Sequence, residues 1–210
     1  MDPTSTMNER LCEDAAAGQE LRYLLTNGDR AFGATLAGKM ALGVIAVPEG
    51  GFTIRTHGYA GQALGFALHE GMRLELDGFA NDTVGEAMGG GVLVIRPPRQ
   101  VPAESRTRLS VCGNAACYGA TGGKLFVEGR AGQRVGVRNS GATIVVEGGG
   151  KYAFEYMTGG VGVVLGPVGP VVGSGLTGGA LFLLDEDGLT REKVHKDAKV
   201  LPMEEADAAR

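Results

Sequence analysis

The sequence lacks the features of several protein classes. Its formal net charge is −4 and its pI is near 5.5, so it has no excess of lysine and arginine for the phosphate backbone of a nucleic acid. No apolar run reaches the roughly 18 residues that a membrane span needs. The start, Met1-Asp2-Pro3, has neither the charged nor the apolar region of a signal peptide. We therefore expect a soluble, cytoplasmic protein that binds neither nucleic acid nor membrane.

Residues that could perform chemistry are also scarce. The three cysteines, Cys12, Cys112 and Cys117, are an odd number and lack metal-ligand spacing, so we expect buried free thiols. The three histidines are far apart, and none has a cysteine or carboxylate at a helical ligand spacing. Residues 173–178 fit the dinucleotide pattern G-x-G-x-x-G, but a β-rich run follows where a phosphate-binding helix should begin. The sequence thus predicts no catalytic residue, no bound cofactor and no metal.

Glycine is the residue in excess, at 37 of 210 positions. It recurs in the pattern G-x-A/V-G-x-x-V/L-G, and the clearest copies start at Gly58, Gly129 and Gly166. A further copy at Gly78 has Asn81 in place of the middle glycine, which we interpret as a turn with a left-handed backbone. The copy at Gly113 is one residue short, so we expect an irregular coil between Gly113 and Gly123.

Short β-rich runs follow these glycines, and the last four of them start 18 or 19 residues apart. They are residues 92–95, 124–127, 142–146, 161–165 and 180–184. Strands so placed can form neither hairpins nor βαβ crossovers, but they can stack in parallel, one coil on the next. The sequence therefore predicts an all-β fold, a single-stranded right-handed parallel β-helix (solenoid) of about six to seven coils with glycines at the corners.

The open ends of such a solenoid need covering. Residues 7–25 carry leucine and alanine at roughly helical spacing and stop at Asn27-Gly28, which predicts an N-terminal capping helix. The segment after Asp185 is strongly charged and is either a cap or a tail that orders on a partner. We therefore divide the chain into an N-terminal helical segment (1–26), a β-helix domain (27–187) and a charged C-terminal cap or tail (188–210).

Several strings, in this order and spacing, resemble one known family. They are Asn27-Gly-Asp-Arg-Ala-Phe-Gly33, Gly58-Tyr-Ala-Gly-Gln62, Ala80-Asn-Asp82, Tyr118-Gly-Ala-Thr121, Val137-Arg-Asn-Ser-Gly-Ala142, Glu155-Tyr-Met-Thr-Gly-Gly160 and Asp185-Glu-Asp-Gly188. They are similar to the GXGXG domain, the C-terminal β-helix of the glutamate synthase large subunit, here as a stand-alone subunit. The chain departs from the family at Tyr152 and Phe154, where histidine and cysteine are usual, and at Ala63-Leu64, where the family has Ser-Phe.

The resemblance implies an architectural role. In the large enzyme this β-helix packs between a glutamine-hydrolysing domain and an FMN-binding synthase barrel. It implies a non-catalytic scaffold subunit of a complex that forms glutamate or N-methylglutamate from glutamine, with a separate glutamine amidotransferase and an FMN-binding synthase as partners and FMN on a partner subunit. A homo-oligomer is possible. The alternatives are a self-assembling structural β-helix without enzyme partners, a scaffold like the β-helical subunit of formylmethanofuran dehydrogenase, or a stand-alone enzyme with outward carboxylates.

A partner interface can be sought among polar residues within the glycine repeat. Asn81 and Asn139 could simply use their side-chain amides to satisfy backbone groups of turns. Alternatively, Arg138, Asn139 and Glu155, about one coil apart, could form part of a docking face. The sequence leaves both interpretations open.

Overall fold

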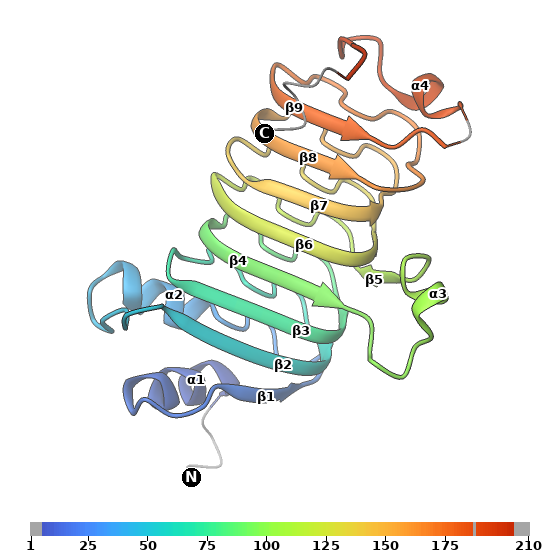
Figure 1. Cartoon of the computed structure of the whole chain (residues 1–210). Coiled ribbons are helices and arrows are strands. Elements are labelled where there is room, and N and C mark those ends of the chain that lie inside the picture. The colour runs from blue at the N-terminus through green and yellow to red at the C-terminus, as the bar shows by residue number, and fades with distance from the viewer. Residues whose placement is uncertain (1–5, 187, 204–210) are drawn as a thin grey trace.

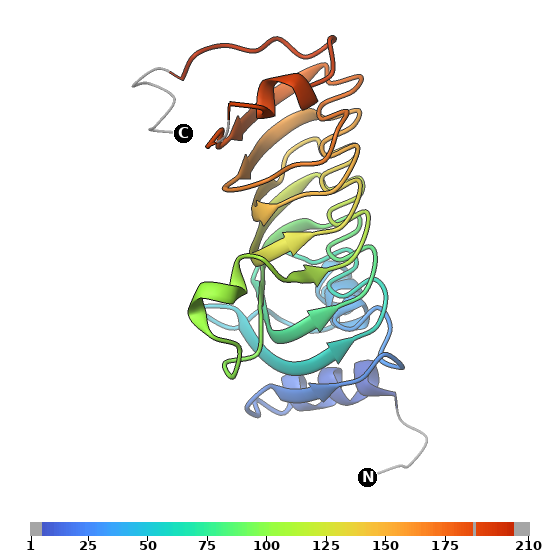
Figure 2. The same ribbon diagram turned by 90° about the vertical axis from the view of Figure 1, so that its right-hand side faces the viewer.

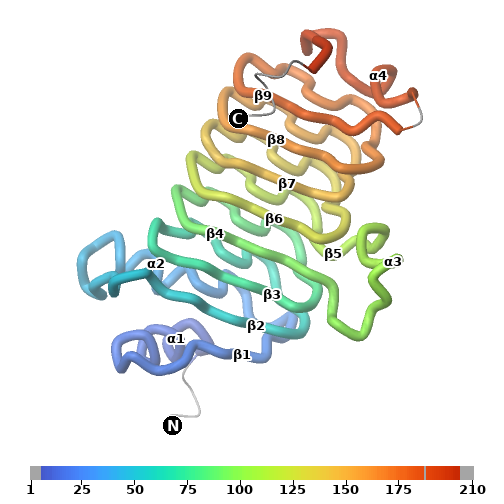
Figure 3. The backbone as a smooth tube through the Cα atoms, in the orientation of Figure 1, coloured from blue at the N-terminus to red at the C-terminus, as the bar shows by residue number. Residues whose placement is uncertain are grey.

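The computed structural model describes residues 6–186 and 188–203, which form a parallel β-helix of about seven turns (Figure 1). The smooth backbone trace shows each coil stacked on the one before (Figure 3). The strands are β1 (Arg22–Leu25), β2 (Phe52–Ala60), β3 (Met72–Ala80), β4 (Gly89–Arg96), β5 (Ser110–Cys112), β6 (Gly122–Ala131), β7 (Thr143–Gly148), β8 (Thr158–Val164) and β9 (Gly178–Leu183). The strands pair in parallel, in the order β1-β2-β3-β4-β6-β7-β8-β9. The predicted fold class is confirmed.

The core is a narrow apolar column inside the coils. Ile54, Leu74, Leu93, Leu125 and Ile144 occupy equivalent positions in successive strands and are fully buried. Side chains alternate across a strand, so these residues point inward while their neighbours point to solvent. Burial of a leucine or isoleucine contributes about 1.5–3 kcal/mol, and each coil repeats that gain.

The N-terminal cap is a helix followed by a strand. Helix α1 (Met7–Ala16) begins with a capping box between Thr6 and Glu9, and it buries Leu11 against the first coil. It ends at Ala16, and Gly18 follows with a left-handed φ of 68°. The prediction of a helix through Leu25 is therefore wrong in extent. Residues 22–25 form strand β1. The sequence pattern does not separate helix from strand here, because a short apolar run fits the helical period of 3.6 residues and the strand period of 2.

Among residues 6–186 and 188–203, three further helices lie outside the repeat. Helix α2 (Ala34–Ala41) follows β1, α3 (Ala103–Arg106) lies between β4 and β5, and α4 (Thr190–Lys193) follows β9. The excursion that carries α3 projects beyond the carboxyl ends of β4 and β6 (Figures 1 and 2). Within the described residues no helix is long and apolar enough to cross a membrane.

This excursion corrects the predicted irregular coil. Gly113 does not start a shortened repeat. It takes the middle-glycine position, because Gly113 N donates to Ala80 O at 3.1 Å as Asn81 N does to Ala60 O one coil earlier at 3.0 Å. The irregularity lies instead at residues 97–109, where the excursion splits one strand into β4 and β5.

Candidate functional site

Opposite the sheet, each coil contains a short segment in which left-handed residues recur at every second position. We call the stack of these segments the turn ladder. All thirteen described non-glycine residues with positive φ lie in it: Ala31, Ala63, Ala67, Thr83, Ala87, Ala115, Cys117, Arg134, Arg138, Tyr152, Phe154, Tyr156 and Val171. Non-glycine residues rarely adopt this conformation, so a regular set of them requires a common cause.

That cause is hydrogen bonding between coils. In the coil of Gly136, Arg134 N donates to Lys151 O and Arg138 N donates to Glu155 O, both 2.8 Å away in the next coil. Gly136 N donates in the opposite direction, to Ala116 O at 2.8 Å in the preceding coil. Alternating left-handed residues thus direct backbone N–H groups to both neighbours, which satisfies groups that burial would otherwise leave unpaired. The ladder is a fixed surface from which side chains project.

The middle glycines of the repeats are required because the stacked coils leave no space there for a Cβ atom. Gly61 and Gly132 do not have positive φ, and a Cβ on Gly132 would lie 2.8 Å from the backbone of Gly113. The left-handed interpretation of the Asn81 position is therefore wrong, since Asn81 is not among the positive-φ residues. Its amide oxygen does accept a hydrogen bond from Asp82 N at 2.8 Å, as the turn interpretation predicts.

The predicted docking residues separate into two groups. Arg138 is exposed and Glu155 is partly exposed, and the 2.8 Å backbone bond between them joins adjacent coils. Asn139 is fully buried, and its Oδ1 accepts from Ala142 N at 2.9 Å while its Nδ2 donates to Ala142 O at 2.9 Å. Asn139 therefore holds a turn and cannot contact a partner through its side chain, which corrects that part of the predicted face.

Cationic and aromatic side chains surround Arg138 and Glu155. The guanidinium of Arg134 lies 3.7 Å from Oε2 of Glu155 and stacks 5.4 Å from the ring centroid of Tyr152. Tyr156 is 51% exposed, and with Arg138 and Thr158 it lines a hollow of about 330 Å³. Arginine and tyrosine are enriched at the centres of protein interfaces, because they bury large areas and also form hydrogen bonds. We call Arg134, Arg138, Tyr152, Glu155 and Tyr156 the ladder patch.

Sequence reasoning finds Arg138 and Glu155 but misses the tyrosines. Tyrosine at a positive φ has no sequence signal, since such positions ordinarily select glycine or asparagine. Phe154, between the two tyrosines, is also left-handed, and its ring is fully buried. Glycines make that room: a Cβ on Gly136 or Gly162 would lie 2.5 Å or 2.4 Å from the ring. The departure from the family at Phe154 is thus packed into the core.

The residues with reactive side chains are separated or buried. All three cysteines are free and buried, as predicted. Burial raises the pKa of Cys112 to about 12, with a further contribution from Asp82, and burial also raises the pKa of Cys117. Within residues 6–186 and 188–203, no group of three histidine, cysteine, aspartate or glutamate side chains could hold a metal ion. The glycines at 173–178 lead into strand β9, not into a helix.

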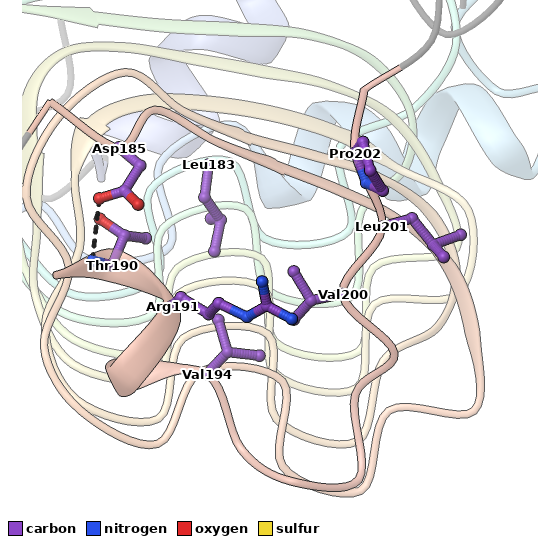
Figure 4. A pocket seen from close by; sticks show the side chains of 8 residues that line it. All are labelled: Leu183, Asp185, Thr190, Arg191, Val194, Val200, Leu201 and Pro202. Atoms are coloured by element: carbon purple, nitrogen blue, oxygen red, sulfur yellow. Dashed lines mark hydrogen bonds between the residues drawn. The ribbon is translucent and has the colours of Figure 1, made fainter. Parts of the chain in front are cut away.

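A larger hollow, of about 410 Å³, lies at the C-terminal end of the solenoid (Figure 4). Apolar side chains of Leu183, Val194, Val200 and Leu201 line much of it. At its edge, Asp185 Oδ1 accepts from Thr190 N at 2.9 Å, and that hydrogen bond lowers the pKa of Asp185. Residues 193 and 194 pair with the last coil, where Val172 N donates to Lys193 O at 2.9 Å. Whether residues 188–210 form a cap or a tail stays a prediction.

Known proteins share this sequence pattern. A family described as GXGXG motif matches residues 5–208. Ferredoxin-dependent glutamate synthase 2 of Synechocystis is 47% identical over 177 residues, which cover 83% of this chain and 11% of that protein. The glutamate synthase [NADPH] large chain of Azospirillum brasilense is 43% identical, over 77% of this chain and 11% of its own length. The chain thus spans about a tenth of the length of these relatives.

Proposed function

On the premise that this chain belongs to the GXGXG-motif family, we propose that it is the scaffold of a glutamate-synthase-like assembly. The observation that carries the proposal is the uneven coverage of the relatives. The match to Synechocystis glutamate synthase takes in 83% of this chain but only 11% of the synthase. The other nine-tenths of such an enzyme has no counterpart in this chain. In this proposal the catalytic domains are therefore supplied by other subunits of the assembly.

The proposed partners are a glutamine amidotransferase and an FMN-binding synthase, which together form glutamate or N-methylglutamate from glutamine. In this proposal FMN binds to the synthase partner, and the β-helix itself acts as a non-catalytic subunit. Its three free, buried thiols agree with assembly in the reducing cytoplasm. The family resemblance supports these assignments, because the residues quoted from Asn27 to Gly188 follow the order of the glutamate synthase domain.

We assign the docking of one partner to the ladder patch. Three features support this: the backbone of the ladder is fixed by hydrogen bonds, Tyr156 is 51% exposed, and Arg138 lies beside a hollow. A rigid surface loses little conformational entropy on binding, so more of the contact energy is retained as affinity. Arginine beside aromatic rings also suits an acidic side chain from a partner.

Copurification from the native cell tests this function. A tagged chain should bring down a flavoprotein with the spectrum of FMN and a polypeptide with glutaminase activity. Arg138→Glu and Tyr156→Ser should each reduce the recovered flavin at least about tenfold, the effect of losing roughly 1.4 kcal/mol. The control is Arg22→Glu, which reverses an exposed arginine on β1, away from the ladder patch. Equal recovery with all three variants would contradict the docking assignment, and recovery of the chain without flavin would contradict the function.

A further inference from the structure

The outer face of the sheet changes character along the solenoid. In the strands β2 and β3 its central column consists of Arg55 and Glu75, as expected for a surface in water. From β4 onward the same column is apolar. Its residues, in register from strand to strand, are Val94, Phe126, Val145, Val163 and Phe182. Phe126 is 37% exposed, and Leu165 and Leu184 beside this column are 45% and 46% exposed.

Val94 is buried, at 8% exposed, but no described segment lies over the column from Phe126 to Phe182. In Figure 1 the outer faces of β6 to β9 point toward the viewer, and no helix or loop of residues 6–186 or 188–203 crosses them. The excursion with α3 lies beyond the strand ends and stands out on the outer side of the sheet (Figures 1 and 2), and its Arg106 pairs with Glu128 at 3.6 Å. Monomeric proteins rarely expose a continuous apolar surface of this kind, so the column marks an interaction site.

Two further columns of outward side chains flank the apolar column, and their charges indicate what kind of surface could bind there. The amino-side column contains Thr53, Arg73, Val92, Lys124, Thr143, Val161 and Ala180, paired in that order. The carboxyl-side column contains His57, Asp77, Arg96, Glu128, Glu147, Leu165 and Leu184, each one residue beyond an inward-facing paired position. We call the three columns together the sheet face.

We propose that the sheet face binds a second copy of this chain, with a two-fold axis along the central column. Such an axis places each strand opposite the same strand of the other copy and exchanges the flanking columns. Flanking side chains of opposite charge, or two apolar side chains, face each other at four of the seven levels. Arg73 faces Asp77, Lys124 faces Glu128, Val161 faces Leu165 and Ala180 faces Leu184, while Phe126, Val145, Val163 and Phe182 meet their own copies on the axis. In β2 and β3 the axis also places Arg55 and Glu75 opposite their own copies.

Glu147 supplies an independent indication of a missing neighbour. Burial raises its pKa, and the carboxylate of Glu128 raises it further. Among the described residues Glu147 has no ion pair of its own, although Glu128 has one with Arg106. In the two-fold arrangement Thr143 of the other copy lies opposite Glu147, and Lys124 of that copy lies one strand away. The cation that this carboxylate lacks within one chain is thus brought near by the second.

The size of the sheet face agrees with a dimer interface. Seven strands about 4.8 Å apart and three columns about 6.6 Å apart cover roughly 34 Å by 20 Å. That is about 700 Å² on each copy, close to the roughly 800 Å² that each partner buries in a standard stable interface. Two packed sheets are also a common architecture, with their strands aligned to within about 30°. The contact is separate from the ladder patch, so it does not depend on the proposed function.

Sedimentation velocity of the pure chain tests this dimer. We expect a mass of twice the 21.6 kDa of one chain, falling toward one chain on dilution. Phe126→Glu should weaken the dimer at least a hundredfold, since the substitution buries two charges on the axis. The control, Tyr118→Glu, changes an aromatic residue of similar exposure, 39% against 37%, on the turn ladder. A single-chain mass at every concentration, or a dimer insensitive to Phe126→Glu, would overturn the proposal.

A charge exchange tests the register of the two copies. Thr143→Lys should tighten the dimer about tenfold, because each copy then offers a cation to Glu147 of the other. Thr143→Glu should weaken it by a similar factor, and adding Glu147→Lys to Thr143→Glu should restore it. Circular dichroism confirms that each variant is folded. If Thr143→Lys and Thr143→Glu change the dissociation constant in the same direction, the proposed axis is wrong.

Discussion

Ala87 offers a direct test of the turn ladder. In most structured positions alanine is more stabilising than glycine, but the left-handed backbone of Ala87 should make glycine the more stabilising residue. Ala87 is exposed, has a φ of 55° and donates its N–H to Tyr118 O at 2.8 Å. Ala87→Gly removes only a methyl group and keeps that hydrogen bond. A left-handed backbone costs an L-residue about 1–2 kcal/mol, and glycine avoids this cost.

Two opposing effects determine the size of the change. Glycine has more conformational freedom in the unfolded chain, which costs about 0.5–1 kcal/mol on folding. Subtracting this from the relief of backbone strain leaves a gain centred on about 0.75 kcal/mol, within a range of about 0–1.5 kcal/mol, for Ala87→Gly. For a chain of this length 1 kcal/mol raises the melting temperature by about 2–4 °C, so we expect an increase of about 1–4 °C.

The assay compares thermal unfolding of Ala87→Gly with that of Ala16→Gly. Ala16 is also exposed but is the last residue of the right-handed helix α1, where glycine should cost about 0.5–1 kcal/mol. The two substitutions are chemically identical and should shift the melting temperature in opposite directions. A decrease for both would refute the left-handed ladder at Ala87.

Three further predictions concern the interior. Gly141→Ala should lower the free energy of unfolding by more than about 2 kcal/mol in chemical denaturation, because the new Cβ would lie 2.2 Å from Thr121 O. The control is Gly38→Ala in α2, where nothing lies within 4 Å of the new Cβ. That substitution should raise the free energy of unfolding by about 0.5–1 kcal/mol. Phe154→Ala should cost about 3–5 kcal/mol by leaving a cavity, and an unchanged denaturation midpoint would show that the ring is not packed in the core. Cys112 should resist thiol reagents at pH 8 in the folded chain and react after unfolding, because burial raises its pKa to about 12; rapid labelling of the folded chain would contradict that burial.

The regular part of the fold can be predicted from the sequence because one physical signal repeats. Glycines such as Gly78 and Gly122 are required where a Cβ would meet the backbone of the preceding coil, at 2.0 Å and 2.6 Å. That steric requirement recurs in coil after coil, so it is visible as a sequence period. The excursion at residues 97–109 breaks the period, and for that reason the pattern alone places the copy at Gly113 wrongly in its coil.

The candidate sites can be predicted only in part. Arg138 and Glu155 interrupt an apolar repeat, which makes them visible, but their sequence neighbour Asn139 points inward because the ladder alternates its side chains. Tyr156 adopts a left-handed conformation that no propensity favours, since hydrogen bonds between coils impose it. The sheet face depends on strand register. Register pairs Phe126 on β6 with Val145 on β7, two residues that lie a full coil apart in the sequence.

The assembly itself is tested most directly by size-exclusion chromatography of a native extract that contains the tagged chain. The account predicts that the tag, FMN absorbance and glutaminase activity elute in one peak at a mass several times 21.6 kDa, and that this peak forms glutamate or N-methylglutamate from glutamine. Removing the chain by its tag should remove the flavin and the synthase activity together. Elution of the tag in a peak without flavin, with synthase activity unchanged after its removal, would contradict the scaffold function.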